Sequence, residues 1–275
     1  MPIHDDLGKR MKEFYENVPK TKLMRRTPVA IRIDGKAFHT FTRGFNKPFD
    51  DVLISAMQDT MKYLCENIQG CVLGYTQSDE ITLILVDYKR LNSSAWFDYE
   101  VQKVCSIAAS MATMAFNKAF NEGVQHRNLS YYAAHATTDN PYPQDDLGQT
   151  YAVKAQIGAL FDARCFNIPK EEVTNLVYWR QLDATRNSIQ MVGQANFSHK
   201  ELQGKSCEKI KEMLIAEKGI SWEDLYPMYQ HGSCCIKVTT EIDGVTRSSW
   251  EIDKNIPLFV GEGREYIESL IQCEE

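Results

Sequence analysis

The chain of 275 residues is long enough for one large domain, or for two modest ones, with a sizeable hydrophobic core. Its composition, 43% hydrophobic and 25% charged, is typical of a soluble globular protein, and no apolar run approaches the roughly 20 residues of a membrane helix. The net charge of −6 argues against a dedicated nucleic-acid binder, and a charged N-terminus without the apolar segment of a signal peptide predicts a cytoplasmic protein with no membrane partner.

The first 168 residues alternate between helical and strand patterns. Apolar spacing predicts these elements in order: a helix over 5–17, a strand over 28–34, a helix over 50–68, strands over 71–75 and 80–88 joined by a tight turn, a helix over 97–121, and a strand over 161–168. Residues 35–49 and most of 123–150 are predicted as loops, with a short strand at 131–137. The order β-α-β-β-α-β predicts an α+β, ferredoxin-like fold, which is also the palm of many nucleotidyl transferases.

The remaining residues are predicted to add helices and one hairpin. Helices are expected from about residue 169, over 202–219 with Gly219 at the end, and over 264–272, and a hairpin over 233–253 with its turn at Asp243-Gly244. We therefore expect a palm-like catalytic domain over 1–168 and a helical and hairpin region over 169–275, either separate or within one compact unit.

Three carboxylates lie at the ends of predicted strands. Asp34 follows the strand AIRI, and Asp79 and Glu80 lie in the turn of the first hairpin. Because the first strand of a β-α-β-β sheet can lie beside the hairpin, we expect Asp34 and Asp79 to meet. Carboxylates held together repel unless a cation neutralises them, and Mg²⁺ takes hard oxygen ligands and phosphate oxygens. The alternative is that Asp34 opens a turn and the other two only decorate a hairpin.

The segment after Asp34, DGKAFH, has the features of a phosphate-binding loop. Gly35 permits close backbone approach, and successive N–H groups can form an anion-binding nest. Lys36, Arg43 and Lys47 add positive charge, although the loop lacks the pattern of a Walker A motif. His39 fits either a ligand contact or a structural role.

RIDGKAFHTF together with GYTQSDEITLIL resembles the tRNA-histidine guanylyltransferase superfamily, whose members extend RNA in the 3′-to-5′ direction. The likeness continues through FDAR (161–164), WRQLDATRN (179–187) and LYPMYQHGS (225–233). The resemblance implies a Mg²⁺-dependent nucleotidyltransferase with a polymerase-like palm that acts on tRNA. It further implies a homotetramer in which ATP activates the 5′-monophosphate of the RNA before the 3′-hydroxyl of an incoming nucleotide attacks it.

The resemblance also implies roles for individual residues. Two Mg²⁺ ions would be held by Asp34, the backbone carbonyl of Gly35, and Asp79, with Glu80 as a third catalytic carboxylate. ATP, GTP or another nucleoside triphosphate would contact Asp34, Gly35, Lys36, Ala37, Phe38, His39, Lys47, Ser78 and Asp79. RNA binding and oligomerisation would fall to residues 169–275.

Candidate RNA contacts lie on two predicted helices. Arg180, Asp183 and Asn187 share one face, since they are three and four residues apart, and they either position RNA or brace the helix. Lys205 and Lys209 are candidate contacts to the RNA backbone, although a solvated helix face explains them as well.

One segment departs from the family pattern. Enzymes that add guanosine to tRNA-histidine read close to HINN after WRQ-x-D, whereas this chain reads ATRN, without the histidine. The departure favours the guanylyltransferase-like branch, which adds nucleotides according to a template and restores 5′-truncated tRNAs. The alternatives are a tRNA-histidine guanylyltransferase proper, a palm-fold nucleotidyl cyclase that acts without RNA, and a non-catalytic RNA-binding module.

Overall fold

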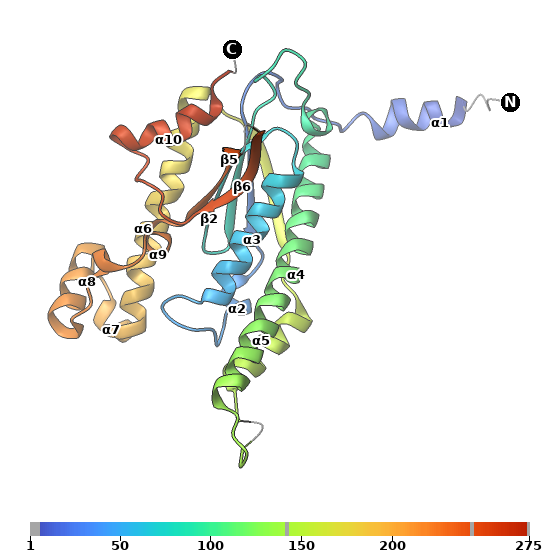
Figure 1. Ribbon diagram of the computed structural model, residues 1–275. Helices are drawn as coiled ribbons and strands as arrows, with labels where there is room; N and C mark the ends of the chain where they lie inside the picture. Colours follow the sequence, from blue (N-terminus) through green and yellow to red (C-terminus); the bar gives the residue numbers. More distant parts are fainter. Residues whose placement is uncertain (1–5, 141–142, 243–244, 274–275) are drawn as a thin grey trace.

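A single antiparallel sheet forms the centre of the protein, which a computed structural model describes over residues 6–140, 143–242 and 245–273 (Figure 1). The sheet has the strand order β4-β1-β3-β2-β5-β6. The strands are β1 (Val29–Gly35), β2 (Cys71–Gln77), β3 (Glu80–Leu85), β4 (Phe161–Asn167), β5 (Ser233–Ile242) and β6 (Val245–Asp253). The first four strands follow the predicted ferredoxin-like order, which confirms the fold class, and the β5–β6 hairpin extends the same sheet beyond β2.

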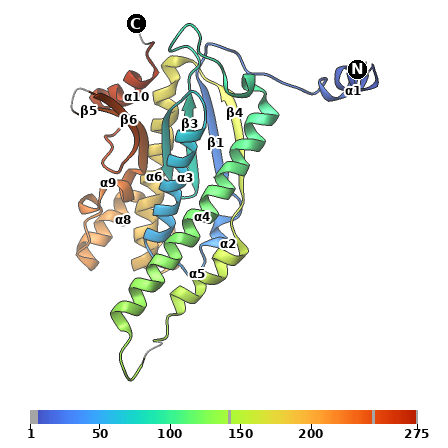
Figure 2. The same ribbon diagram turned by 45° about the vertical axis from the view of Figure 1, so that its right-hand side comes forward.

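Helices cover both faces of the sheet (Figures 1 and 2). The α-helices of the described residues are α1 (Asp6–Met11), α2 (Phe38–Phe41), α3 (Asp51–Asn67), α4 (Val101–His135), α5 (Asp146–Ile157), α6 (Val173–Asn196), α7 (His199–Leu202), α8 (Cys207–Met213), α9 (Pro227–His231) and α10 (Glu265–Glu268). Of these, α1 does not cover the sheet but projects away from it (Figure 1). Within the described residues, no helix is long and apolar enough to cross a membrane.

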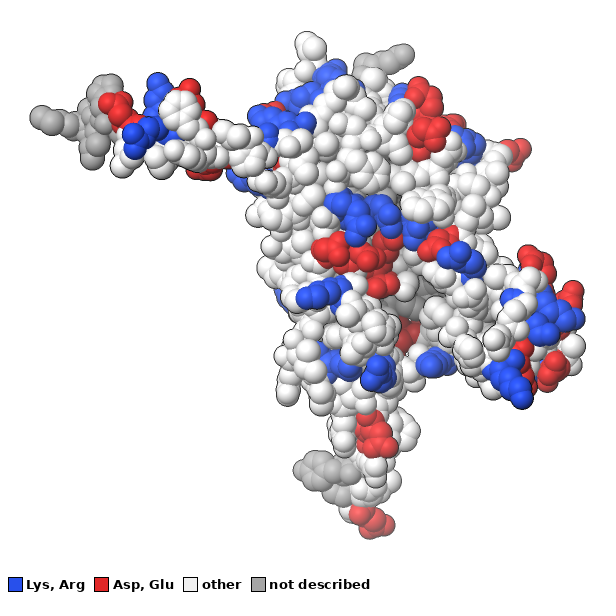
Figure 3. Space-filling model, turned by 180° about the vertical axis from the view of Figure 1, so that it is seen from behind, with Lys and Arg blue, Asp and Glu red and all other residues white. Residues whose placement is uncertain are grey.

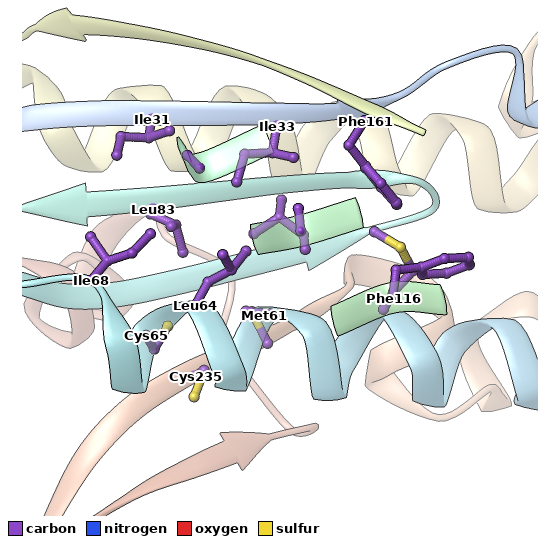
Figure 4. Packing of buried hydrophobic residues seen from close by; sticks show 14 of the residues in the cluster. Ile31, Ile33, Met61, Leu64, Cys65, Ile68, Leu83, Phe116, Phe161 and Cys235 are labelled. Atoms are coloured by element: carbon purple, nitrogen blue, oxygen red, sulfur yellow. The ribbon is translucent and has the colours of Figure 1, made fainter. Parts of the chain in front are cut away.

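The alternation of side chains along β1 separates two hydrophobic clusters. Ile31 and Ile33 face α3 and α4, where they pack in one cluster with Leu64 and Phe116 (Figure 4). Ala30 faces the opposite side, in a second cluster to which α6 contributes. Full burial of an apolar side chain such as Leu64 stabilises the fold by about 1.5–3 kcal/mol. Because β1 contributes buried side chains to both clusters, packing on both faces of the sheet fixes the position of the strand and of its end.

The structure corrects four predictions of secondary structure. The loop expected over most of 123–150 is largely helical, because α4 runs to His135 and α5 begins at Asp146. The strand expected at 131–137 is wrong, because α4 continues to His135 and an ion pair from Arg127 to Asp145 ties its extension to the start of α5. The loop expected over 35–49 contains α2, a single helical turn. The helix expected over 202–219 is interrupted where Gly204 takes a positive φ of 73° and Ser206 caps a new helix, α8. The predicted turn at Asp243-Gly244 lies outside the described residues.

Candidate active site

The end of β1 meets the turn between β2 and β3. The strand register places Asp34 directly opposite Glu80 of β3 on one side and Asp162 of β4 on the other. The N–H of Gly35 donates to the backbone carbonyl of Asp79, at an N–O distance of 3.0 Å. The structure therefore brings Asp34, Asp79 and Glu80 to one end of the sheet, as the sequence predicted.

Electrostatic repulsion is built into this arrangement. Burial raises the pKa of Asp34 above its ordinary value, and the charges of Glu80 and Asp162 raise it further. Burial likewise raises the pKa of Asp79, against a hydrogen bond of 3.0 Å from the Ser78 hydroxyl that lowers it, and the charge of Asp34 adds to the increase. A cation between the carboxylates would relieve this cost, because it favours their charged forms.

Glu80 has a different environment from the other two carboxylates. Its side chain is buried, with 6% of the residue exposed. One carboxylate oxygen accepts from Arg180 Nε of α6 at 2.7 Å, and the other accepts from Arg32 of β1. The structure thus places Glu80, predicted as catalytic, in an ion-pair network that connects the β2–β3 turn to β1 and to α6.

The predicted RNA contacts on α6 belong to the same network. Arg180 is 7% exposed and also donates to Asp183, at 2.8 Å, while the Asn187 side-chain amide donates to the same carboxylate oxygen at 3.3 Å. The three residues share a helix face, as predicted, and their bonds to one another correspond to the helix-bracing alternative. Asn187 also lines a small pocket of about 100 Å³ between α3, α6 and α9.

Two charged residues near Asp34 were missed as site residues. Asp162 and Arg164 lie on β4 opposite Asp34 and Arg32, and a side-chain hydrogen bond of 2.9 Å joins them. The available signal was the alternation of charged and small residues in FDAR, which indicates an edge strand with one polar face. Seen from behind, this face gathers acidic side chains at its centre, with basic side chains above and below (Figure 3).

A cavity of about 760 Å³ opens beside the carboxylates. Of the residues predicted to bind the nucleotide, all except Asp34 and Lys36 line it: Gly35, Ala37, Phe38, His39, Lys47, Ser78 and Asp79. The backbone N–H of Lys36 instead donates a hydrogen bond to the carbonyl of Leu160, at an N–O distance of 2.8 Å. Because the N–H groups of Gly35 and Lys36 are both used within the protein, the predicted nest cannot include them. Beyond Lys36, the loop returns to the cavity at Ala37, which takes the left-handed conformation at φ 55°.

The geometry of the loop that follows β1 depends on close packing between two of its residues. A Cβ atom on Gly35 would lie 2.2 Å from the ring of Phe38. That ring is buried and packs against Phe116 and Phe161, with centroid distances of 5.5 and 5.2 Å. Phe38 therefore anchors the loop through its side chain and lines the cavity near its backbone.

The opposite wall of the cavity carries Lys47. Asp50, at the start of α3, accepts hydrogen bonds from the N–H groups of Asn46 and Leu53, both at 3.0 Å, and from the hydroxyl of Tyr151. These bonds fix both ends of the segment 46–50, so the exposed Lys47 side chain extends from a rigid base.

Lys205 and Lys209 lie farther from the carboxylates. Both are exposed, and Lys209 pairs with Glu212 at 2.9 Å. Lys205 lines a hollow of about 600 Å³ that shares Gln194 of α6 with the 760 Å³ cavity. A polymer that leaves the cavity in this direction would pass Lys205.

The donor set of the site suits a hard cation. Among the described residues, no group of three or more His, Cys, Asp and Glu side chains is placed to hold a metal ion. A cation at Asp34 and Asp79 would therefore need backbone or substrate oxygens as well, which is how Mg²⁺ is commonly held in phosphate-transfer sites.

Comparisons with known proteins all indicate one family. The model of the family described as "Thg1: tRNAHis guanylyltransferase" matches residues 8–169. A bacterial tRNA(His) guanylyltransferase (Thg1)-like protein in complex with ATP superposes with a TM-score of 0.78 at 39% identity, over 97% of this chain and 99% of that one. A complex with GTP gives 0.75 at 36%, with the same coverage. The tRNA(His) guanylyltransferase 2 of Arabidopsis thaliana is 23% identical over 98% of this chain, which spans about half of that protein (48%).

Proposed function

The chain belongs to the tRNAHis guanylyltransferase family and is a nucleotidyltransferase, and we propose that it adds nucleotides to the 5′ end of tRNA in the 3′-to-5′ direction under the control of a template base. Its role would be the repair of 5′-truncated tRNA. The observation that carries this proposal is that the end of β1 at Asp34 meets the turn that carries Asp79, and that Asp79 lines a cavity together with Gly35, residues 37–39 and Lys47.

Two Mg²⁺ ions fit the oxygen donors that these residues offer. Asp34 and Asp79 would hold them together with the carbonyl of Gly35, and the shared repulsion of the two carboxylates supports this assignment. When bound, such ions polarise the attacking oxygen and stabilise the leaving pyrophosphate.

The remaining residues bind and orient the substrates. The segment 37–39 and Lys47 would hold the triphosphate of ATP, GTP or another nucleotide, and the ATP and GTP complexes of the similar bacterial protein support nucleotides as substrates. The 5′-monophosphate of the RNA would attack ATP and release pyrophosphate, which leaves an adenylylated 5′ end. The 3′-hydroxyl of the incoming nucleotide would then attack the activated 5′ phosphate of the RNA and release AMP. Glu80 would keep the turn that carries Asp79 in register with Asp34, through its bonds to Arg180 and Arg32.

The ATRN segment on α6 supports template control over selection of tRNA-histidine. Ala184 is buried, and the hydroxyl of Thr185 is hydrogen-bonded to Nδ1 of His231 at 3.0 Å. Side chains that are engaged inside the protein are not available to read an RNA base. Base choice would then come from pairing with the template nucleotide opposite the 5′ end.

We assign RNA binding and subunit contacts mainly to residues 169–275, and propose that the protein assembles as a homotetramer. Exposed Lys205 and Lys209 support the first assignment. Light scattering coupled to size exclusion tests the second, and a monomeric mass at assay concentration would contradict it.

The test of the proposed function supplies a 5′-truncated tRNA transcript, ATP, Mg²⁺ and each of the four nucleotides in turn. We expect incorporation of the nucleotide complementary to the template base, and a switch of product when that base is changed. Addition of G alone, whatever the opposing base, would contradict template control, and a cyclic mononucleotide as product would contradict RNA as substrate.

Variants test the assignment of the carboxylates. Asp34→Ala and Asp79→Ala should abolish addition while circular dichroism and the unfolding midpoint show an intact fold. Asp139→Ala, an exposed acidic residue beyond the end of α4, is the matched control and should retain activity. Turnover that persists in either pure active-site variant would refute the assignment.

A further inference from the structure

Trp179 of α6 is a large aromatic residue with an open face. It is 52% exposed, although the guanidinium carbons of Arg180 and Arg32 lie 4.5 and 5.3 Å from its ring centroid. Both arginine side chains are largely buried, at 8% and 19% exposed, because they pair with Glu80. The indole therefore contacts both guanidinium groups and still leaves about half of its surface open to solvent.

The location of this ring relates it to the carboxylates. Arg32 is two residues before Asp34 on β1, so Trp179 lies beside the strand just before the strand reaches the site. The triphosphate cavity contacts α6 at Met191 and Gln194 instead. Met191 is 12 residues further along, or about 18 Å at the rise of an α-helix. Asp34 thus lies between the cavity and the Trp179 ring along the direction of α6.

The charges around Trp179 explain why a stacking contact is needed there. Asp34, Asp79 and Asp162 gather negative charge at this end of the sheet, and acidic side chains lie at the centre of the face seen in Figure 3. Such charge repels the phosphates of a nucleic acid. Arg164, the cross-strand neighbour of Arg32, and Arg186, two turns along α6, are exposed at 56% and 61% of their side chains. Each is ion-paired with an aspartate, Arg164 with Asp162 at 2.9 Å and Arg186 with Asp183, so their charges are already compensated within the protein. An uncharged stacking contact is therefore the kind of contact that this face offers to a nucleic acid.

We propose, on the premise of the proposed function, that Trp179 is the platform on which the terminal base pair of the RNA stem stacks when its 5′ end reaches Asp34 and Asp79. Every base has a π face, so stacking tolerates any sequence. That property suits an enzyme that must accept whichever template base the stem presents. The ion pairs under the ring hold it at a fixed height above the sheet, so the stacked end is placed at a fixed distance from the carboxylates.

The test separates stacking from a covering role over the ion pairs. Trp179→Leu keeps an apolar cover without a stacking face, whereas Trp179→Phe keeps both. A truncated tRNA with 2-aminopurine in the terminal base pair of its stem reports stacking on that pair through quenching of its fluorescence. Fluorescent ATP and the unfolding midpoint report on the rest of the site, and Tyr132→Leu, an exposed aromatic at the far end of α4, is the control.

We expect Trp179→Leu to raise the Kd for the RNA by about 10- to 100-fold and to abolish quenching, since stacking on an aromatic contributes about 1–3 kcal/mol per base. ATP affinity and the unfolding midpoint should stay within error, Trp179→Phe should retain most of the RNA affinity, and Tyr132→Leu should behave as wild type. Unchanged RNA affinity in Trp179→Leu would overturn the proposal, as would a parallel loss of ATP binding and stability. Quenching by the wild type without any nucleotide addition would support the stacking contact and overturn the proposed function, so the two failures are distinguishable.

Discussion

Removal of one partner from the Arg180–Glu80 pair should destabilise the protein strongly. Arg180→Met takes the guanidinium away from Oε1 of Glu80, now 2.7 Å from Arg180 Nε, in a site where both residues are less than a tenth exposed. Loss of one partner of a buried pair typically costs about 3–5 kcal/mol, because a charge is left buried without compensation. Arg32 still contacts the other oxygen, which places the expected loss at the lower end, about 3 kcal/mol.

The assay is equilibrium unfolding in urea, followed by circular dichroism. We expect Glu80→Gln to cost less than Arg180→Met, because Arg180 keeps Asp183 at 2.8 Å as a second partner. The double variant should lose less than the sum of the two single losses, with a coupling energy of at least about 1 kcal/mol. A loss below about 1 kcal/mol in Arg180→Met, together with weaker RNA binding and a smaller salt dependence, would refute the bracing role and make Arg180 an RNA contact.

Two further predictions concern the loop and the half-buried His231. Gly35→Ala should cost about 1–3 kcal/mol of stability, because the added methyl group overpacks against the Phe38 ring. The displaced loop should also raise the KM for the nucleotide more than the KM for the RNA. A variant with unchanged stability and an unchanged nucleotide KM would contradict the packing argument. Burial lowers the pKa of His231 below its ordinary value of 6.5, so the unfolded chain takes up a proton that the folded protein does not, and stability should fall as the pH decreases below about 6.5. His231→Gln should lose less unfolding free energy than the wild type between about pH 7.5 and about pH 5.5, and equal losses in the two proteins would refute this assignment.

The core of the fold was predictable because its signals are local. Short β-branched strands alternate with long amphipathic helices through residue 121, and the tight turn at Ser78-Asp79 is visible in the sequence. The extension of α4 to His135 was not, since tertiary contacts such as Arg127 with Asp145 hold it against α5. Local propensity cannot report a partner that the chain supplies 18 residues later.

The candidate site shows the same division. Asp34 and Asp79 could be paired from strand order alone, and the family resemblance pointed to the loop that lines the cavity. The environment of Glu80 could not be predicted, because its partner Arg180 is 100 residues away in the chain. Asp162 was missed because the alternation in FDAR indicates an edge strand with a polar face but not which strand lies beside it, and the pairing of β4 with β1 is a contact between distant parts of the chain.

The continuity of α6 has a consequence for how this chain can change over time. Residues 173–196 form one unbroken helix, which contacts Glu80 through Arg180 and borders the cavity at Met191. Insertion or deletion of a single residue between these two positions would turn one end of the helix by about 100° relative to the other, so the two functional contacts could not both survive. Substitutions on its exposed side are tolerated far more easily, and the loop around Gly204 beyond its end can vary in length. Among relatives, we therefore expect the number of residues between the positions of Arg180 and Met191 to be constant, while the identities of the exposed residues between them vary.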